Sequence, residues 1–180
     1  MVMILGYTAK ESFKKGKIGI ADIEIYLTNQ SETIEVINVE NDEFYQNKDI
    51  DLIWKRKVNG QIIESKIEVK SDSYIKTGNY FIEIISNDKK NTLGCFLYTE
   101  ADYYYYYFYN LKELHIMPMP ESRTWFNANI HRFGKDVSTS TEDDYGNHLY
   151  NTIGKLVKKT MMQEEVPTIE VLERLNEIHP

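Results

Sequence analysis

Two carboxylates and a lysine lie where a β-hairpin would bring them together. Residues 51–58 and 62–70 each have the pattern of a strand, and Asn59-Gly60 between them is a strong signal for a tight turn. A hairpin places the start of its first strand beside the end of its second, so Asp51 and Glu68 should be neighbours although they are 17 positions apart. Because side chains alternate along a strand, Glu68 and Lys70 should share one face while Val69 points into the core.

This set of groups suits metal-assisted chemistry. Paired carboxylates are hard oxygen ligands for Mg²⁺ or Mn²⁺, and the backbone carbonyl of Val69 can add a further oxygen. The ion would polarise a phosphoryl oxygen and acidify a bound water. Lys70 would orient or deprotonate that water, or neutralise charge on the phosphate. The alternative is a set of solvated charges at the end of a hairpin.

The order of Asp51 and then Glu68-Val69-Lys70 resembles the signature of the PD-(D/E)XK nuclease superfamily. Ile50 stands where the family name has a proline. The resemblance implies an α/β, restriction-endonuclease-like fold with the order helix-strand-strand-strand, in which helices flank a mixed β-sheet. It also implies hydrolysis of DNA phosphodiester bonds, with Mg²⁺ or Mn²⁺ bound by Asp51, Glu68 and the Val69 carbonyl.

The first helix departs from the pattern of similar sequences. Nucleases of this superfamily often carry an acid there, and sequences that resemble this chain show Gly-Lys-x-Gly-Glu. This chain has GKIGI at residues 16–20, so the acid is absent from the expected place. Glu24 or Asp22 could substitute by a shift in register, and the alternative for either is a surface acid.

Three more polar residues are candidates for supporting roles. Gln46 precedes the first hairpin strand, where related sequences often have glutamine. Asp72 alternates with Lys70 and should lie near it. Glu83 lies inside an apolar strand, where an unpaired acid is costly to bury, so it either faces solvent or assists the site. In relatives this segment often contains Gly-Asn-x-x-x-Glu, as residues 78–83 do here.

The remaining pattern alternates strands with a few helices. We expect a single domain over residues 1–180, with a nuclease-like core at about 13–130 and a C-terminal extension at about 131–180. Helices are predicted at 11–27, at 121–130 and from Pro167 onward. Strands are predicted at 33–39, 80–85, 95–98, 103–109, 112–119 and 148–162, and residues 136–147 are expected to form a loop.

Residues 103–109 are almost entirely tyrosine. With a period of two, alternate tyrosines would cover both faces of a strand. Such rows can stack nucleic-acid bases, but they more often pack a core. The pattern of Gly94, Thr99 and Ala101-Asp102-Tyr103 at the start of this strand is similar to that of small phage and prophage nuclease-like proteins.

Charge and composition restrict the function classes. The 180 residues include 21 basic and 28 acidic side chains, a net charge of −7, which counts against a general nucleic-acid binder. Residues 161–180 alone contribute −4 of this, so a DNA substrate stays compatible with the rest of the chain. The single Cys95 excludes an internal disulfide and a cysteine-cluster zinc site. No apolar run is long enough to span a bilayer, and we expect a cytoplasmic protein without a membrane partner.

Two other function classes stay open. A catalytically inactive nuclease-like module that binds DNA or protein would explain the negative charge and the missing first-helix acid. An interaction protein would use the tyrosine-rich sheet as an interface. The final predicted helix would either cap the domain or pair across a homodimer.

Overall fold

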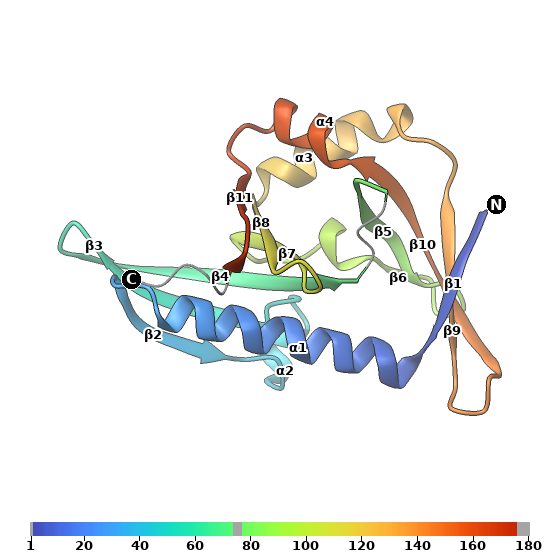
Figure 1. The fold of residues 1–180 in the computed structure, drawn as a ribbon, viewed down its shortest axis with the longest axis horizontal. Coiled ribbons are helices and arrows are strands. Elements are labelled where there is room, and N and C mark those ends of the chain that lie inside the picture. The colour runs from blue at the N-terminus through green and yellow to red at the C-terminus, as the bar shows by residue number, and fades with distance from the viewer. Residues whose placement is uncertain (1, 74–76, 176–180) are drawn as a thin grey trace.

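The computed structural model describes residues 2–73 and 77–175, which form a mixed α/β fold built on two β-sheets (Figure 1). The strands are β1 Val2–Thr8, β2 Thr33–Asn38, β3 Leu52–Val58, β4 Gln61–Asp72, β5 Asn79–Asn87, β6 Thr92–Leu93, β7 Tyr103–Phe108, β8 Glu113–Pro118, β9 Val137–Glu142, β10 His148–Lys158 and β11 Glu170–Leu172. The helices are α1 Ala9–Thr28, α2 Glu43–Gln46, α3 Glu121–Asn129 and α4 Lys159–Glu165, with 3₁₀ turns η1 Cys95–Leu97 and η2 Ile130–Arg132.

The larger sheet has the strand order β11-β8-β7-β4-β3-β2. Strands β2, β3 and β4 form an antiparallel meander, β7 runs parallel to β4, and β8 runs antiparallel to β7. The predicted hairpin is confirmed, with Asn59 and Gly60 both at positive φ (51° and 81°) as a type I′ turn requires. Leu52, the first residue of β3, pairs with Ile67, so β4 continues for several residues beyond the stretch that β3 covers.

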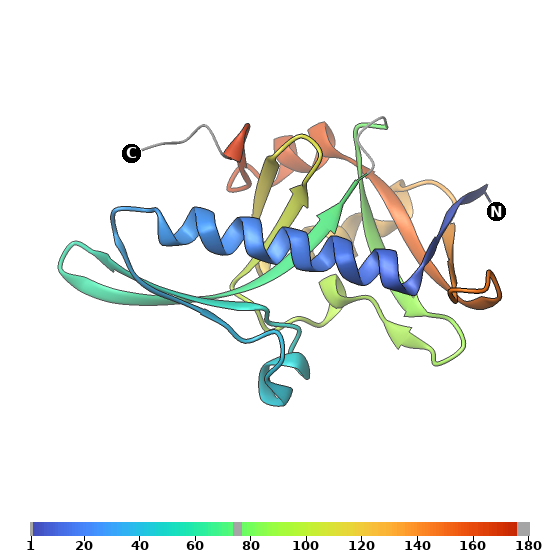
Figure 2. The same cartoon turned by 60° about the horizontal axis from the view of Figure 1, so that its bottom comes forward.

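Helix α1 covers one face of the larger sheet (Figure 2). It begins with a capping box, in which the Thr8 hydroxyl accepts from the Glu11 N–H and the Glu11 carboxylate accepts from the Thr8 N–H. Its buried stripe of Ile20, Ile23 and Leu27 packs against β3, β4 and β7. Gly19 is needed for this packing, because a Cβ there would lie 1.7 Å from the Ser71 Oγ. Among the described residues, no helix is both long enough and apolar enough to cross a membrane.

The smaller sheet has the order β1-β9-β10-β5-β6, with β1 parallel to β9. Its strands β5 and β10 pack, together with α3 and α4, against the opposite face of the larger sheet. Strand β7 therefore lies between two cores. Tyr104, Tyr106 and Phe108 face the smaller sheet, whereas Tyr105 and Tyr107 face α1, and all five are buried. The tyrosine run thus packs the interior instead of presenting an aromatic surface.

A buried polar network joins the two sheets. His115 Nδ1 on β8 lies 2.6 Å from the Tyr80 hydroxyl on β5, and its Nε2 lies 2.5 Å from the Glu113 carboxylate. Lys159 donates to the same Glu113 oxygen, and the Gln163 amide donates to the Tyr80 hydroxyl. Burial lowers the pKa of His115 and outweighs the opposing effect of Glu113. These contacts give His115 a structural role in the interior.

Several predicted elements are wrong. Residues 95–98 form the 3₁₀ turn η1 instead of a strand, and residues 137–142 of the expected loop form β9. The strand expected over 148–162 ends at Lys158, where α4 begins. The final helix is replaced by β11, which pairs with β8, as far as the described residues extend. β1 was not anticipated at all.

Candidate functional site

The hairpin brings Asp51 and Glu68 into direct contact. Asp51 immediately precedes β3, and its N–H donates to the Ile67 carbonyl at 2.9 Å. Its side chain turns back onto β4, where Oδ2 accepts from the Val69 N–H at 2.9 Å. The Asp51 and Glu68 side chains are also hydrogen-bonded to each other. The two carboxylates are therefore neighbours, as predicted. They lie next to Leu52 and Ile67, the pair at which the pairing of β3 with β4 stops.

Burial raises the pKa of both carboxyl groups of the pair. Burial raises the pKa of Asp51 to about 6, although the hydrogen bonds from Val69 and Glu68 oppose the rise. Burial, followed by the charges of Asp51 and Asp49, raises the pKa of Glu68 well above its ordinary value. Glu68 is therefore the group that holds the proton at neutral pH and donates it to the Asp51 carboxylate.

Asp49 is a third acid near the pair. Burial raises the pKa of its carboxyl, a hydrogen bond from the Tyr98 hydroxyl lowers it, and the charge of Glu83 raises it. Asp49 has a positive φ of 46°, and its carbonyl accepts from the Thr99 hydroxyl at 2.6 Å. Its Oδ2 is buried and has no hydrogen-bond partner among the described residues. The sequence places Asp49 two residues before Asp51, but nothing in it signals the contact with Tyr98.

Lys70 faces the same side of β4 as Glu68 and forms an ion pair with Glu83 on β5. Burial alone would lower the pKa of Lys70, but the Glu83 carboxylate raises it above its ordinary value. Lys70 is therefore an ammonium group at neutral pH. The sequence left open whether Glu83 faces solvent or the site, and the structure places it at Lys70.

Gly94 lets η1 pack close to the ion pair of Lys70 and Glu83. The Gly94 N–H donates to the Ile84 carbonyl at 3.0 Å, and a Cβ on Gly94 would lie 2.1 Å from the Glu83 carbonyl oxygen. This close approach holds Cys95 near Glu68 and Lys70, with its Sγ 3.4 Å from the Tyr104 hydroxyl. Burial and nearby acids raise the pKa of the Cys95 thiol. Cys95 therefore lines the site as an unreactive thiol and is not a nucleophile.

Asp72 follows Lys70 on the same face of β4. Its carboxylate accepts from the Tyr106 hydroxyl at 2.5 Å, and that hydroxyl also accepts from the Phe81 N–H. Asp72 and Lys70 both line a pocket of about 340 Å³ between α1, the end of β4 and the smaller sheet. Asp72 thus lies beside the predicted site, as expected, but belongs to the pocket and not to the carboxylate pair.

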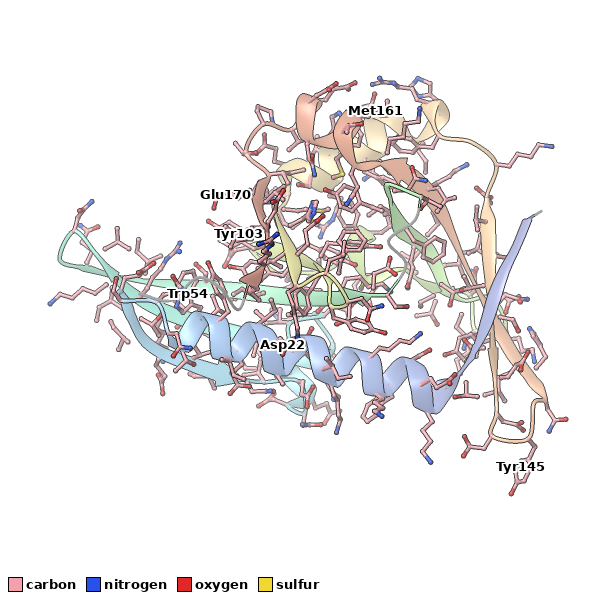
Figure 3. The ribbon with its side chains drawn as sticks, viewed as in Figure 1. Asp22, Trp54, Tyr103, Tyr145, Met161 and Glu170 are labelled. Carbon is pink, nitrogen blue, oxygen red and sulfur yellow. The ribbon has the colours of Figure 1, made fainter. Side chains whose placement is uncertain are left out.

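The structure does not bring Glu24 to the carboxylates. Helix α1 packs on the face of β4 that holds Val69 and Ser71, opposite the face of Glu68 and Lys70. Glu24 accepts instead from the Asn38 amide at 3.3 Å. Asp22 is also occupied on this side, where the Tyr107 hydroxyl and Lys112 donate to its carboxylate (Figure 3).

Gln46 is likewise outside the carboxylate pair. It ends α2, and its side-chain amide donates to the Glu40 carbonyl at 2.7 Å. Its own carbonyl accepts from the Asp49 N–H. Gln46 therefore helps to fix the turn that leads into Asp51, which is an indirect contribution to the geometry of the site.

The residues present fit a divalent cation on two grounds. Asp51 and Glu68 are adjacent oxygen donors that repel each other when both are charged, and Asp49 adds a buried oxygen without a hydrogen-bond partner among the described residues. A cation would provide the charge compensation that Lys70, already paired with Glu83, gives only in part. Among the described residues no group of three or more His, Cys, Asp or Glu side chains is arranged as a metal site, so the fit rests on the pair.

Comparison with known proteins gives no relative. No protein-family model, curated protein or solved structure matches the chain.

Proposed function

We propose that the protein is a metal-dependent nuclease that hydrolyses DNA phosphodiester bonds. The observation that carries the proposal is the contact between Asp51 and Glu68, because the hairpin register places a half-buried and a buried carboxyl group side by side, each with a raised pKa. Ion pairs and hydrogen bonds satisfy ordinary structural acids, whereas this pair relies on a proton that a cation would replace.

The arrangement of elements supports the same proposal. The order α1, β2, β3 and β4 is the helix-strand-strand-strand order that the resemblance implies. Asp51, Glu68, Val69 and Lys70 lie at one edge of β4, beyond the last residue that β3 covers.

Each residue has a definite part in the proposed reaction. Asp51, Glu68 and the Val69 carbonyl would hold Mg²⁺ or Mn²⁺, which polarises the phosphoryl oxygen and acidifies water. Glu68 must lose its proton to act as a ligand. Because Lys70 is protonated, it is suited to orienting water and to stabilising charge that develops on the phosphate, and a role as general base is disfavoured. Glu83 would hold the Lys70 ammonium in place.

The test is cleavage of plasmid, branched and single-stranded DNA in Mg²⁺ or Mn²⁺. We expect Asp51→Asn and Lys70→Ala to abolish cleavage without loss of fold. Lys66→Ala is the matched control, because Lys66 is on the same strand and face and makes no contact with the carboxylates. Cleavage that survives Lys70→Ala would refute the role of this lysine. Absence of cleavage by the folded wild-type protein on every substrate would refute the nuclease.

A non-catalytic binding module is the second candidate. It is favoured by the Lys70–Glu83 ion pair, by the burial of Glu68 and by the absence of an acid from α1 at the carboxylates. In that case Glu68 would keep its proton, and the pair would bind no cation. Isothermal titration with Mn²⁺ separates the two candidates, since heat of binding that disappears in Asp51→Asn supports the metal site.

A further inference from the structure

The pocket beside Lys70 has the composition of a site for a polar ligand. Its walls come from the first turns of α1, the end of β4, and β5, β9 and β10 of the smaller sheet. Nine of the described residues that line it are serine or threonine. Hydroxyl groups both donate and accept hydrogen bonds, and they commonly contact the sugars and phosphates of nucleic acids.

One of these hydroxyls is buried and has no partner. Ser71 Oγ lies under α1 and makes no hydrogen bond among the described residues. Buried polar atoms are nearly always satisfied in folded proteins, so Ser71 brings an unmet hydrogen-bonding group to the wall of the pocket. The Ser71 hydroxyl fills the space beside Gly19, because a Cβ at position 19 would lie 1.7 Å from it.

Aromatic and basic side chains complete the lining. Phe81 and Tyr150 are the aromatic residues of the described wall, and Lys15 and Lys70 are its basic ones. Asp72 and Glu83 balance these charges, which makes the pocket neutral on a chain whose net charge is −7. Aromatic faces stack on bases, and lysines beside hydroxyls suit a sugar-phosphate backbone.

Size and position restrict the ligand further. A pocket of about 340 Å³ is at the small end of the range for bound ligands, which corresponds to roughly one nucleotide and excludes a base-paired duplex. Lys70 and Glu83 line the pocket and also adjoin the carboxylate pair. A strand that reached Asp51 and Glu68 would therefore place its next nucleotide here.

We propose that this pocket holds one unpaired nucleotide of a nucleic-acid strand, so that the substrate is single-stranded DNA or a frayed strand end and not continuous duplex. The inference rests on the proposed function, because it takes the bound strand to be the substrate. It adds the form of the substrate and names Tyr150 and Lys15 as residues that bind it.

Binding without cleavage tests the inference separately from the nuclease. The assay is fluorescence anisotropy with a labelled ten-nucleotide single strand and the matched blunt duplex, in EDTA. We expect the single strand to bind at least tenfold more tightly than the duplex. Tyr150→Ala should weaken single-strand binding by fivefold or more, the range for loss of one stacked base. Lys15→Ala should reduce the slope of log Kd against log salt by about 0.7.

Two controls are matched in chemistry and differ in position. Tyr145→Ala removes a tyrosine that is 91% exposed at the tip of the β9–β10 hairpin, where Figure 3 shows it away from the body of the protein. Lys14→Ala removes an exposed lysine next to Lys15 that does not line the pocket. Both variants should bind the single strand like the wild type.

The outcomes are distinct. Single-strand binding that depends on Tyr150 in a protein that never cleaves would support this pocket and refute the nuclease. Cleavage that requires Lys70, together with equal binding of single strand and duplex, would refute the pocket and leave the nuclease standing. Equal effects of Tyr150→Ala and Tyr145→Ala would also refute it. If free thymidine monophosphate bound as tightly as the oligonucleotide, the pocket would be a site for a free nucleotide, and the proposal that it binds part of a nucleic-acid strand would be refuted.

Discussion

Replacing Asp51 by asparagine should stabilise the metal-free protein at high pH. The Asp51 carboxyl is held in a site where burial raises its pKa to about 6, so its charged form destabilises the fold. Asparagine is nearly isosteric and does not titrate. Its carbonyl oxygen can still accept the Val69 N–H, and its amide can still contact Glu68. The variant would therefore keep the local geometry without the buried charge.

The size of the effect follows from the shift in pKa. A rise from 3.8 to about 6 is worth about 3 kcal/mol at about 1.4 kcal/mol per pKa unit. The folded chain binds the Asp51 proton more tightly than the unfolded chain does. The free energy of unfolding of the wild type therefore falls as pH rises from about 4 to about 6, and above pH 6 the whole of this stability has been lost. The hydrogen bond from Val69, which stabilises the charged form, is already included in this pKa. The gain at pH 8 is then about 3 kcal/mol, or a Tm higher by roughly 6–12 °C.

The assay is thermal unfolding followed by circular dichroism in EDTA at pH 4.5 and at pH 8. The advantage of Asp51→Asn should grow with pH and be small or absent at pH 4.5, where the wild-type carboxyl is protonated. Asp144→Asn, at an exposed position in the β9–β10 hairpin, is the control and should show no such trend. A variant that is less stable than the wild type at pH 8, or whose advantage does not change with pH, would refute the buried-charge reasoning.

Three further predictions concern other parts of the structure. Binding of Mn²⁺ at pH 7 should release about one proton from Glu68, which calorimetry in buffers of different ionisation enthalpy would measure. The Glu68→Gln variant should release none. A wild-type protein that also releases none would contradict a protonated Glu68. Gly94→Ala should lower the free energy of unfolding in urea by about 1–3 kcal/mol, because the new Cβ would meet the Glu83 carbonyl. Gly134→Ala is the control and should be near neutral, because a Cβ there has no atom within 4 Å. Equal losses of stability in the two variants would contradict the close approach of Gly94 to Glu83. Tyr80→Phe should cost about 1–3 kcal/mol because His115 and Gln163 lose a buried partner, while Tyr145→Phe should change little, and a neutral Tyr80→Phe would count against the network.

The hairpin could be predicted because its information is local. Asn59-Gly60 fixes the turn, the turn fixes the register, and the register places Asp51 opposite Glu68. The pairing of Lys70 with Glu83 could not be predicted in the same way. It depends on β5 of the other sheet passing close to β4, and no spacing in the sequence encodes that distance.

The missed elements share a cause, which is that long-range packing overrides local pattern. Residues 137–142, VSTSTE, are too polar to indicate a strand, yet Ser138, Ser140 and Thr141 are buried because β9 lies between β1 and β10. That error also concealed the hydroxyl-lined pocket, since β9 supplies part of its wall. Residues 95–98 have the composition of a strand, but the contact of Gly94 with Glu83 turns the chain into η1 instead.

Strand β7 poses a problem of alignment for the folding chain. In most strands a slip by one residue exposes apolar side chains and buries polar ones, which penalises the wrong pairing. Here a slip would exchange one tyrosine for another on both faces, so hydrophobicity hardly distinguishes the alternatives. The hydroxyl groups supply the discrimination, because only the observed pairing lets Tyr106 reach Asp72 while Tyr107 reaches Asp22 on the opposite face. The hydroxyl groups of these tyrosines, and not their apolar rings, therefore determine the register of β7 against β4. Through this register they also fix the position of β4, the strand that carries Glu68 and Lys70.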